Sequence, residues 1–303
     1  VPKLADLMDE PLADASLIPT YLLSKFTRQH VTVAVGGDGG DEVFLGYPTF
    51  PAERLYQRFW RWQPRVLRQA LAAFANRLPT SFDYFSLDFK LKRFAAGLLA
   101  PDALRHQAWL TSTTPGQFST LLTAEAQAAI GSTDVYAGLM EHTARVRAAT
   151  SLQQCTYEYL KGYLMDQVLV KVDRASMAAS LEVRAPLLDY RFVEFVANLP
   201  DHLKLRGLTT KYLLKKVMAG RLPDEIIHRR KQGFAIPVAR WLATELQPLA
   251  RQLLSPDRLR QQGIFNPAHV TRLLDEHTAR RHDHRQQLWS LLCFQLWHDR
   301  WLR

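Results

Sequence analysis

A run of β-branched residues that ends in a turn of glycines and acids is the feature that most constrains this chain. VTVAV (31–35) is followed directly by GGDGGDE (36–42). The run predicts a buried strand of an α/β sheet, and the glycines expose backbone at its carboxyl end, where ligands sit in open α/β sheets. Glycine lets backbone N–H groups approach an anion closely and adopt positive φ. The stretch therefore predicts a ligand-binding edge of a sheet.

The acids of this turn indicate what kind of ligand would fit. Asp38, Asp41 and Glu42 would repel a bare phosphate, but they suit a site that also needs a divalent cation or a general base. The stretch is not a P-loop, because it lacks the Gly-Lys-Ser/Thr ending, and its glycine spacing is not that of a dinucleotide fingerprint. The alternative is an acidic surface turn without a ligand. An EF-hand calcium loop would need more acids at alternating positions.

Most of the remaining chain is predicted to be helical. The helix near 51–75 is expected to break at Pro64, Ser151 and Gln154 have the spacing of a capping box, and Asp189 is a suitable N-cap. Residues 76–120 hold several prolines and are expected to be irregular. The expected helices are 17–29, 51–75, one from Ser151 onward, 174–180, 190–198, 211–219 and 288–302.

Strands are scarce in this sequence. VTVAV (31–35) is the one convincing strand, with at most two more short ones. An isolated strand is not stable. We therefore expect most of the other strands of its sheet to lie outside these 303 residues.

The basic balance of the chain raises the question of a nucleic-acid partner. There are 39 Lys and Arg against 29 Asp and Glu, a net charge of +10. The densest basic stretch with aromatic residues is RLYQRFWRWQPRVLRQ (54–69). Such a stretch is typical of a nucleic-acid interface, and equally of a helix that buries Trp and Leu and turns Arg outward. No nucleic-acid motif accompanies it, so we expect the second arrangement and no nucleic-acid partner.

Other general features favour an ordinary cytoplasmic protein. No stretch approaches the roughly 20 apolar residues of a membrane span, and no secretory signal is visible, so we expect no membrane partner. Cys155 and Cys293 lie among apolar or aromatic neighbours and are expected to be buried free thiols, although a single disulfide would also be compatible with the sequence.

Four segments together resemble a known family. VGGDGGDEVFLGY (35–47) resembles the Ser-Gly-(Glu/Asp)-Gly-(Ser/Gly)-Asp-Glu-x-Phe-x-Gly-Tyr turn of the asparagine synthetases, ATP-dependent ligases that use glutamine. DEPLADASLIPTYLLS (9–24), VKVDRASMAASLEVRAPLLD (170–189) and RRKQGFAIPVARWL (229–242) are similar to three further family segments, in the family's order. Four matches in order are far more specific than any one of them.

The resemblance implies an α/β, helix-rich fold: an ATP pyrophosphatase domain of the adenine-nucleotide α-hydrolase-like kind, mostly α in the part present. The family also has an N-terminal glutaminase domain with a cysteine nucleophile and a Ser-Gly-Gly-x-Asp-Ser pyrophosphate loop, and neither occurs in these residues. We therefore expect 1–303 to be the C-terminal portion of one synthetase domain. Residues 1–50 would be a remnant of the nucleotide-binding core and 51–303 its helical remainder, inactive in isolation.

The resemblance also implies roles for the turn. The backbone of Gly36 and Gly37 would border ATP, and Gly36 replaces the serine that the family usually has. Asp38 would accept a proton from ammonia or position the acyl-adenylate. Asp41 would hold Mg²⁺ on the pyrophosphate, with a second carboxylate from the absent loop. Glu42 is expected to cap the following turn or to pair with a basic residue.

Two further segments supply candidate ligands. Lys231 matches the family's lysine near the pyrophosphate, where a cation on a mobile loop would neutralise the leaving group, and Gly233 would let that loop bend. Without the resemblance, a solvated basic turn would be the better interpretation. Asp173 is a candidate contact with the nucleotide, whereas the pair Asp173 and Arg174, expected between two helices, would more often be a structural cap or salt bridge.

Other polar groups are interpreted as structural. Glu182 and Arg184 are expected to face the same way and to form a buried pair. The histidines of HTARRHDHR, at 277, 282 and 284, lack the spacing of a zinc site and are expected on a solvated helix face.

The resemblance implies the chemistry of the complete protein. It would activate a carboxylate, aspartate or an analogue, with ATP to give an acyl-adenylate and pyrophosphate, and ammonia from glutamine would then form the amide. Relatives with the same turn act on β-lactam, peptide or cell-surface sugar precursors, so the acceptor acid stays open, and a homodimer is compatible with the sequence. The alternative function is a non-catalytic, basic helical interaction module.

Overall fold

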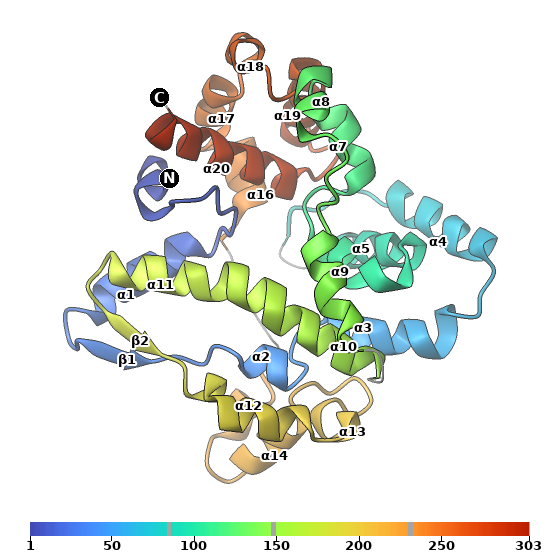
Figure 1. Cartoon of the computed structure of the whole chain (residues 1–303), viewed down its shortest axis with the longest axis vertical. Coiled ribbons are helices and arrows are strands. Elements are labelled where there is room, and N and C mark those ends of the chain that lie inside the picture. Colours follow the sequence, from blue (N-terminus) through green and yellow to red (C-terminus); the bar gives the residue numbers. More distant parts are fainter. Residues whose placement is uncertain (84–85, 147–149, 230–232, 235, 303) are drawn as a thin grey trace. The chain divides into compact units, whose positions relative to one another are not determined.

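The computed structural model describes residues 1–83, 86–146, 150–229, 233–234 and 236–302 (Figure 1). The chain divides into two compact units that interleave along the sequence: one comprises 1–15, 64–136 and 236–303, and the other 16–63 and 137–235. The division expected from the sequence, into 1–50 and 51–303, separates two parts of one domain. The two compact units do not test that division, which stays a prediction.

The described part of the first unit contains helices and an isolated β-bridge between Leu122 and Phe265, but no strand. It contains η1 (Pro2–Leu7), α4 (Arg65–Arg77), α5 (Leu87–Leu99), η3 (Asp102–Leu104), α6 (Arg105–Leu110), α7 (Pro115–Leu121), α8 (Ala124–Ile130), α16 (Val238–Ala243), α17 (Gln247–Leu253), α18 (Pro256–Gln262), α19 (Pro267–Thr278) and α20 (Arg285–Trp301). The final helix α20 is the centre of its core: Leu288 and Leu292 are fully buried. The helix expected at 288–302 is thereby confirmed.

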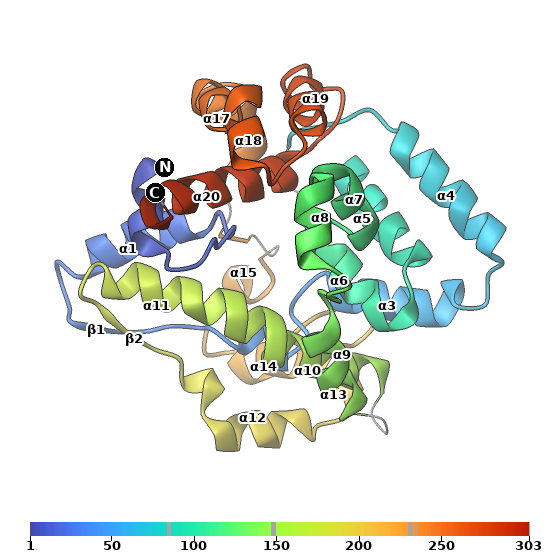
Figure 2. The ribbon, with the colours of Figure 1, turned by 45° about the horizontal axis from the view of Figure 1, so that its top comes forward.

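The second unit adds a pair of strands to its helices. It contains α1 (Leu17–Thr27), β1 (Val33–Val35), α2 (Gly40–Val43), α3 (Thr49–Leu55), η2 (Tyr56–Trp60), α9 (Ala137–Ala144), α10 (Ser151–Glu158), η4 (Tyr159–Leu169), α11 (Val170–Met177), β2 (Glu182–Arg184), η5 (Pro186–Leu188), α12 (Tyr190–Ala197), α13 (Asp201–Lys204), α14 (Tyr212–Met218) and α15 (Asp224–Ile227). Within this unit α1 packs along α11, as Figures 1 and 2 both show.

β1 and β2 run parallel, which requires the long helical connection between them. Val33 pairs with Glu182 and Val35 with Arg184. The strand is shorter than the expected 31–35, and its predicted burial is wrong: Val33 and Val35, which share a face, are 39% and 74% exposed. A sheet of two strands leaves that face of β1 without a covering layer in the described part of the chain.

The helix that begins at Ser151 is longer than expected. α10, η4 and α11 follow one another without a break, with π-helical geometry in the middle. The capping box is formed by Thr150 and Gln153, one residue before the predicted pair. Asp173 and Arg174 therefore lie within α11 and not between two helices, so the predicted helix junction is wrong.

The other helix predictions have mixed outcomes. Pro64 is the N-cap of α4, which confirms the predicted break, and the Asp189 side chain accepts the Arg191 N–H at 3.0 Å, which confirms that cap. The irregular segment expected over 76–120 is wrong, because α5, η3, α6 and most of α7 occupy it. Two of its prolines begin helices: Pro101 is the N-cap of η3, and Pro115 is the first residue of α7.

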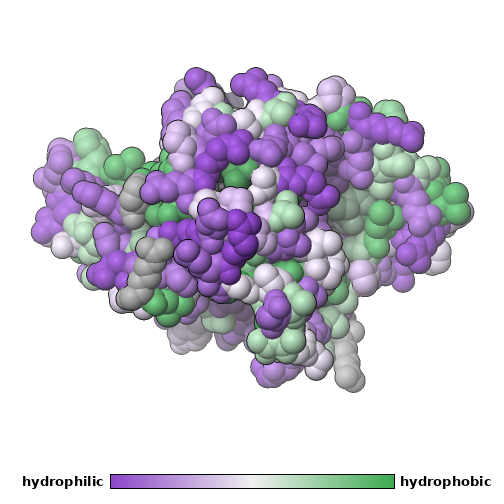
Figure 3. Space-filling view, turned by 90° about the horizontal axis from the view of Figure 1, so that it is seen from above, coloured by the Kyte–Doolittle hydropathy of each residue, from purple (hydrophilic) through white to green (hydrophobic). Residues whose placement is uncertain are grey.

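In the basic aromatic stretch 54–69, Trp60 is only partly buried and Trp62 is not buried as expected. Trp62 is 78% exposed, with the Arg61 guanidinium 5.3 Å from its ring centroid, and Phe59 is also exposed. Figure 3 shows one face of the molecule, where apolar side chains reach the surface between hydrophilic ones. Cys155 and Cys293 are buried free thiols, as predicted. No helix in the described ranges is both long and apolar enough to cross a bilayer.

A buried carboxyl group in the second unit makes the stability of the fold depend on pH. Glu158 of α10 is buried, and the Thr143 hydroxyl donates to it at 3.2 Å. Burial, with the nearby charge of Glu53, raises the pKa of Glu158 from 4.5 to about 7. Because the folded protein holds this proton more tightly, the contribution of Glu158 to the free energy of unfolding falls as pH rises from about 4.5 to 7.

Glu158→Gln is expected to remove this penalty. Relative to the parent protein, the variant should gain about 3–4 kcal/mol in the free energy of unfolding between pH 4.5 and pH 8, since the pKa rises from 4.5 to about 7 and each pKa unit is worth about 1.4 kcal/mol. Urea denaturation at several pH values measures the difference. Glu141→Gln, on the exposed surface of α9, is the control and should show no such trend. Parallel pH profiles for the parent and Glu158→Gln would contradict the assignment.

Candidate active site

The glycine-acid turn begins where β1 ends. The Gly36 N–H donates to the Arg184 carbonyl at 2.7 Å and so extends the strand pairing by one residue. A Cβ at Gly36 would lie 2.9 Å from an Asp38 carboxylate oxygen and 3.3 Å from Val183, so the position is crowded. A Cβ at Gly37 would meet nothing within 4 Å, and that residue is exposed. Gly37 is therefore the open part of the backbone edge.

Within the turn, the positive φ that glycine permits occurs at Gly39. Its φ is +86°, and it is the N-cap of α2. A Cβ at Gly39 would also collide with the Leu188 side chain of η5. Conformation and space both require glycine at this position.

The two acids of α2 have different surroundings. Glu42 is only 1% exposed, and the Tyr47 hydroxyl donates to its carboxylate at 2.7 Å. Burial and the charge of Glu42 hold the pKa of Tyr47 far above its usual value. The Tyr47 ring stacks on Tyr159 of η4 with ring centroids 5.2 Å apart. Glu42 thus anchors the turn to the long helix instead of facing a ligand.

Asp41 pairs with a lysine that the sequence did not single out. Lys211 Nζ lies 2.9 Å from Asp41 Oδ1, and both side chains are about three-quarters buried. The two residues come from segments far apart in the chain, so no local motif or spacing could have predicted the pair. Lys211 was expected only as the start of a helix; it is the N-cap of α14.

This pairing bears on the magnesium role predicted for Asp41. Within the described residues no group of three or more His, Cys, Asp or Glu could hold a metal ion. A single carboxylate already paired with an ammonium group does not make a magnesium site, which needs several oxygen ligands. The residues present do not fit Mg²⁺ by themselves.

The remaining predicted ligands are not gathered around the turn. Asp38 lies beside Gly36 and is partly buried. Asp173 is exposed on α11, and no hydrogen bond or ion pair between described residues joins its side chain to the turn. Lys231 lies outside the described residues. Gly233 is described and exposed.

The predicted burial of the Glu182–Arg184 pair is wrong. Arg184 Nε does donate to Glu182 Oε1 at 2.7 Å, but the side chains are 67% and 54% exposed. Both belong to β2 and point to the same side of the strand, as the spacing predicted. The face of β2 that they share lies outside the core. As at Val35, no further layer covers this face in the described part of the chain.

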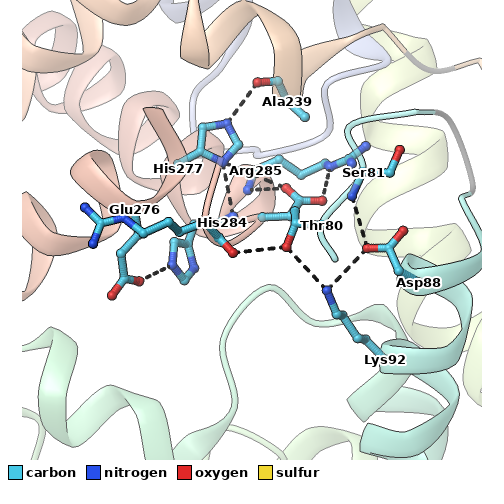
Figure 4. A network of polar contacts seen from close by, with 11 residues as sticks. Thr80, Ser81, Asp88, Lys92, Ala239, Glu276, His277, His284 and Arg285 are labelled. Atoms are coloured by element: carbon cyan, nitrogen blue, oxygen red, sulfur yellow. Dashed lines mark hydrogen bonds and ion pairs between the residues drawn. The ribbon is translucent and has the colours of Figure 1, made fainter. Parts of the chain in front are cut away.

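A second polar cluster, in the first unit, surrounds His277 (Figure 4). His277 is fully buried, contrary to the solvated face expected for it: its Nε2–H donates to the Ala239 carbonyl at 2.9 Å, and its Nδ1 accepts the His284 N–H at 3.2 Å. The His284 ring in turn lies 2.7 Å from a Glu276 oxygen. Burial lowers the pKa of His277, so the neutral ring is favoured. These groups satisfy one another and indicate a structural role.

Two surface hollows lie away from the turn. A hollow of about 690 Å³ in the first unit is lined by Arg260, Arg272 and Glu276 among others. Another of about 400 Å³ lies along residues 28–33 and reaches the first residue of β1. Neither includes a residue of the glycine-acid turn. We place the candidate site at the turn because the open backbone and the acids are there. A sheet of only two strands offers no further strands that could enclose a pocket at this edge.

Comparisons with known proteins match almost the whole chain. The model of the asparagine synthase family matches residues 1–299. The chain is 29% identical to asparagine synthetase [glutamine-hydrolyzing] 1 of Bacillus subtilis, over 99% of this chain and 45% of that protein. It is 31% identical to a putative asparagine synthetase [glutamine-hydrolyzing] of Mycobacterium bovis, over 98% of this chain and 44% of that protein.

A fungal protein is also similar. The chain is 25% identical to amidase chyE of Penicillium rubens, over 84% of this chain and 40% of that protein. The chain thus spans less than half the length of each of these relatives.

The close packing around Gly46 provides a structural test of this site. A Cβ at Gly46 would collide with Asp41 Oδ1 and Lys211 Cε. Gly46→Ala should therefore push the ion pair apart and lower the free energy of unfolding by about 1–3 kcal/mol, as overpacking does. Gly37→Ala is the matched control in the same turn, with an expected change under about 0.5 kcal/mol. Chemical denaturation measures both, and equal stability of the two variants would contradict the described packing.

Proposed function

This chain belongs to the asparagine synthase family, and on that premise we propose that it is the C-terminal part of the synthetase domain of a glutamine-dependent amidotransferase. A carboxylate attacks the α-phosphate of ATP, which gives an acyl-adenylate and releases pyrophosphate. Ammonia then attacks the acyl carbon, loses a proton and displaces AMP to leave the amide. The acceptor is aspartate or a related carboxylic acid.

The observation that carries this proposal is the position of the glycine-acid turn. It follows the carboxyl end of a parallel strand, and its Gly37 backbone has open space beside it. Ligands bind at this edge in open α/β sheets. The turn also lies within the stretch that resembles the family's ATP-binding turn.

The exposed apolar surface of the second unit supports an incomplete sheet. Val33 and Val35 of β1 are exposed, and so are Leu22, Leu23 and Phe26 of α1. Soluble domains normally cover such side chains. We propose that further strands of an adenine-nucleotide α-hydrolase-like sheet, with the pyrophosphate loop, complete this unit in the working protein.

The turn residues then have distinct tasks. The Gly37 backbone borders the nucleotide, and Asp38, beside it, accepts a proton from the attacking ammonia or positions the acyl-adenylate. Glu42 stays buried against Tyr47 and fixes the turn. Lys231 and Asp173 are proposed contacts with the pyrophosphate and the nucleotide. No step is routed through a metal ion, because the residues present do not form a metal site.

Pyrophosphate release by the intact protein tests the proposal. With ATP, glutamine and a panel of carboxylic acids, we expect release that depends on one acid or a narrow set. Asp38→Asn should lower kcat/KM by about 10²–10⁴-fold, the usual contribution of a general base. Glu141→Gln, on the exposed surface of α9, should leave the rate unchanged. Release of inorganic phosphate with ADP, or activity indifferent to Asp38, would refute the proposed chemistry.

The isolated 303-residue chain is expected to release no pyrophosphate, because no Ser-Gly-Gly-x-Asp-Ser loop occurs in its sequence. The same assay on the purified chain measures this, with a circular-dichroism spectrum to show that it is folded. Turnover that Asp38→Asn abolishes would show that the loop is dispensable.

A further inference from the structure

We propose that helix α4 binds an anionic lipid surface: an apolar stripe on its outer side enters the interface of the membrane, and the arginines beside the stripe contact the headgroups. The inference goes beyond the proposed ligase chemistry and does not depend on it. The start of α4 belongs to the basic stretch 54–69, which the proposed function leaves unused.

One side of α4 is fixed within the first unit. Figures 1 and 2 both show α4 beside α5, and the two helices pack together. Ala72 and Ala75 of α4 are buried in a cluster with Ala95 of α5. The Arg68 guanidinium also donates to the Leu98 carbonyl of α5 at 3.3 Å. These contacts hold α4 in the fold and determine which side of the helix faces away from α5.

The opposite side of α4 is apolar and exposed. Val66 is 74% exposed, Leu67 47% and Phe74 58%. With about 3.6 residues per turn, the spacing of three and four residues places these side chains and two exposed alanines on one side of the helix. We call this side the outer stripe, and it consists of Val66, Leu67, Ala70, Ala73 and Phe74. A continuous exposed stripe of this kind is typical of a surface that binds an apolar partner.

The charges beside the outer stripe favour an anionic partner. Arg65 and Arg77 are exposed at the two ends of α4. The sequence contains no Asp or Glu between positions 54 and 82, a range that includes all of α4. The neighbouring helix α5 adds the exposed Lys90, and its one acid, Asp88, is buried. Cations in this arrangement are attracted to the anionic headgroups of a membrane surface.

The chemistry of the outer stripe favours lipid over nucleic acid. Val66 and Leu67 are aliphatic, so they cannot stack on bases as the aromatic side chains of a nucleic-acid interface do. They gain free energy when they leave water for hydrocarbon. A helix at a membrane interface places apolar side chains in the acyl region and lets long basic side chains reach back to the headgroups. The expectation of no membrane partner rested on the lack of a spanning segment and a secretory signal, and a helix that lies on the surface needs neither.

Vesicle binding by the intact protein tests the inference. In cosedimentation we expect binding to vesicles of phosphatidylcholine and phosphatidylglycerol in equal parts, and about 10- to 100-fold weaker binding to phosphatidylcholine alone. Phe74→Ser should weaken binding to the mixed vesicles about tenfold, and Val66→Ser is the second variant should the first not fold. Ile130→Ser removes an exposed apolar side chain from α8 and should stay within about twofold of the parent protein. Equal binding to the two kinds of vesicle, or to neither, would overturn the inference.

A fluorescent label shows which side of α4 meets the lipid. Phe74→Cys places a polarity-sensitive dye in the outer stripe, and Asn76→Cys places it at an exposed position outside the stripe. Cys155 and Cys293 are buried, so the dye reacts with the introduced thiol. On addition of the mixed vesicles, the emission of the dye at position 74 should shift to shorter wavelength, and the shift at position 76 should be smaller. Equal shifts at the two positions would contradict the stripe as the contact surface.

Other occupants of the outer stripe give different results. If another part of the intact protein covers the stripe, the dye at position 74 reports apolar surroundings before vesicles are added, and the inference fails. It also fails if an RNA oligonucleotide binds and the vesicles do not, or if Phe74→Ser only changes the oligomeric state, which would show that the stripe joins two copies of the chain. None of these measurements uses pyrophosphate release, so the proposed function and this inference are tested separately.

Discussion

The parallel pairing of β1 with β2 is the interaction on which the rest of the site depends. It aligns Val35 with Arg184, and the Gly36 N–H continues the pairing to the Arg184 carbonyl. β2 then runs into η5, whose Leu188 occupies the space beside Gly39. One short strand pair therefore sets both the start of the turn and the surface against which it packs, and a slip in register would move both.

The environment of each acid in the turn is set by the residues packed around it more than by the local sequence. Glu42 is buried against Tyr47, Asp41 is held by Lys211, and Asp38 lies beside the crowded Gly36. Three acids that look alike in the sequence thus have three different environments. One acid is buried and another is paired with an ammonium group, so the turn repels an anion less than its sequence alone implies.

Local signals in the sequence predicted local structure well. The break at Pro64 and the cap at Asp189 depend on nearby backbone groups, and both are confirmed. Contacts and burial that depend on distant segments of the chain could not be predicted from local sequence patterns. The Lys211–Asp41 pair joins remote parts of the chain, and the exposure of Val35 depends on whether a neighbouring layer is present. The prolines at 101 and 115 were misread because proline both ends helices and begins them.

The family relationship and the open turn together make nucleotide binding at Gly37 the central claim. A crystal structure of the intact protein with α,β-methylene-ATP tests it most directly. The account predicts electron density for the phosphates beside the Gly37 backbone. Phosphate density bound elsewhere on the protein, with the turn unoccupied, would contradict it.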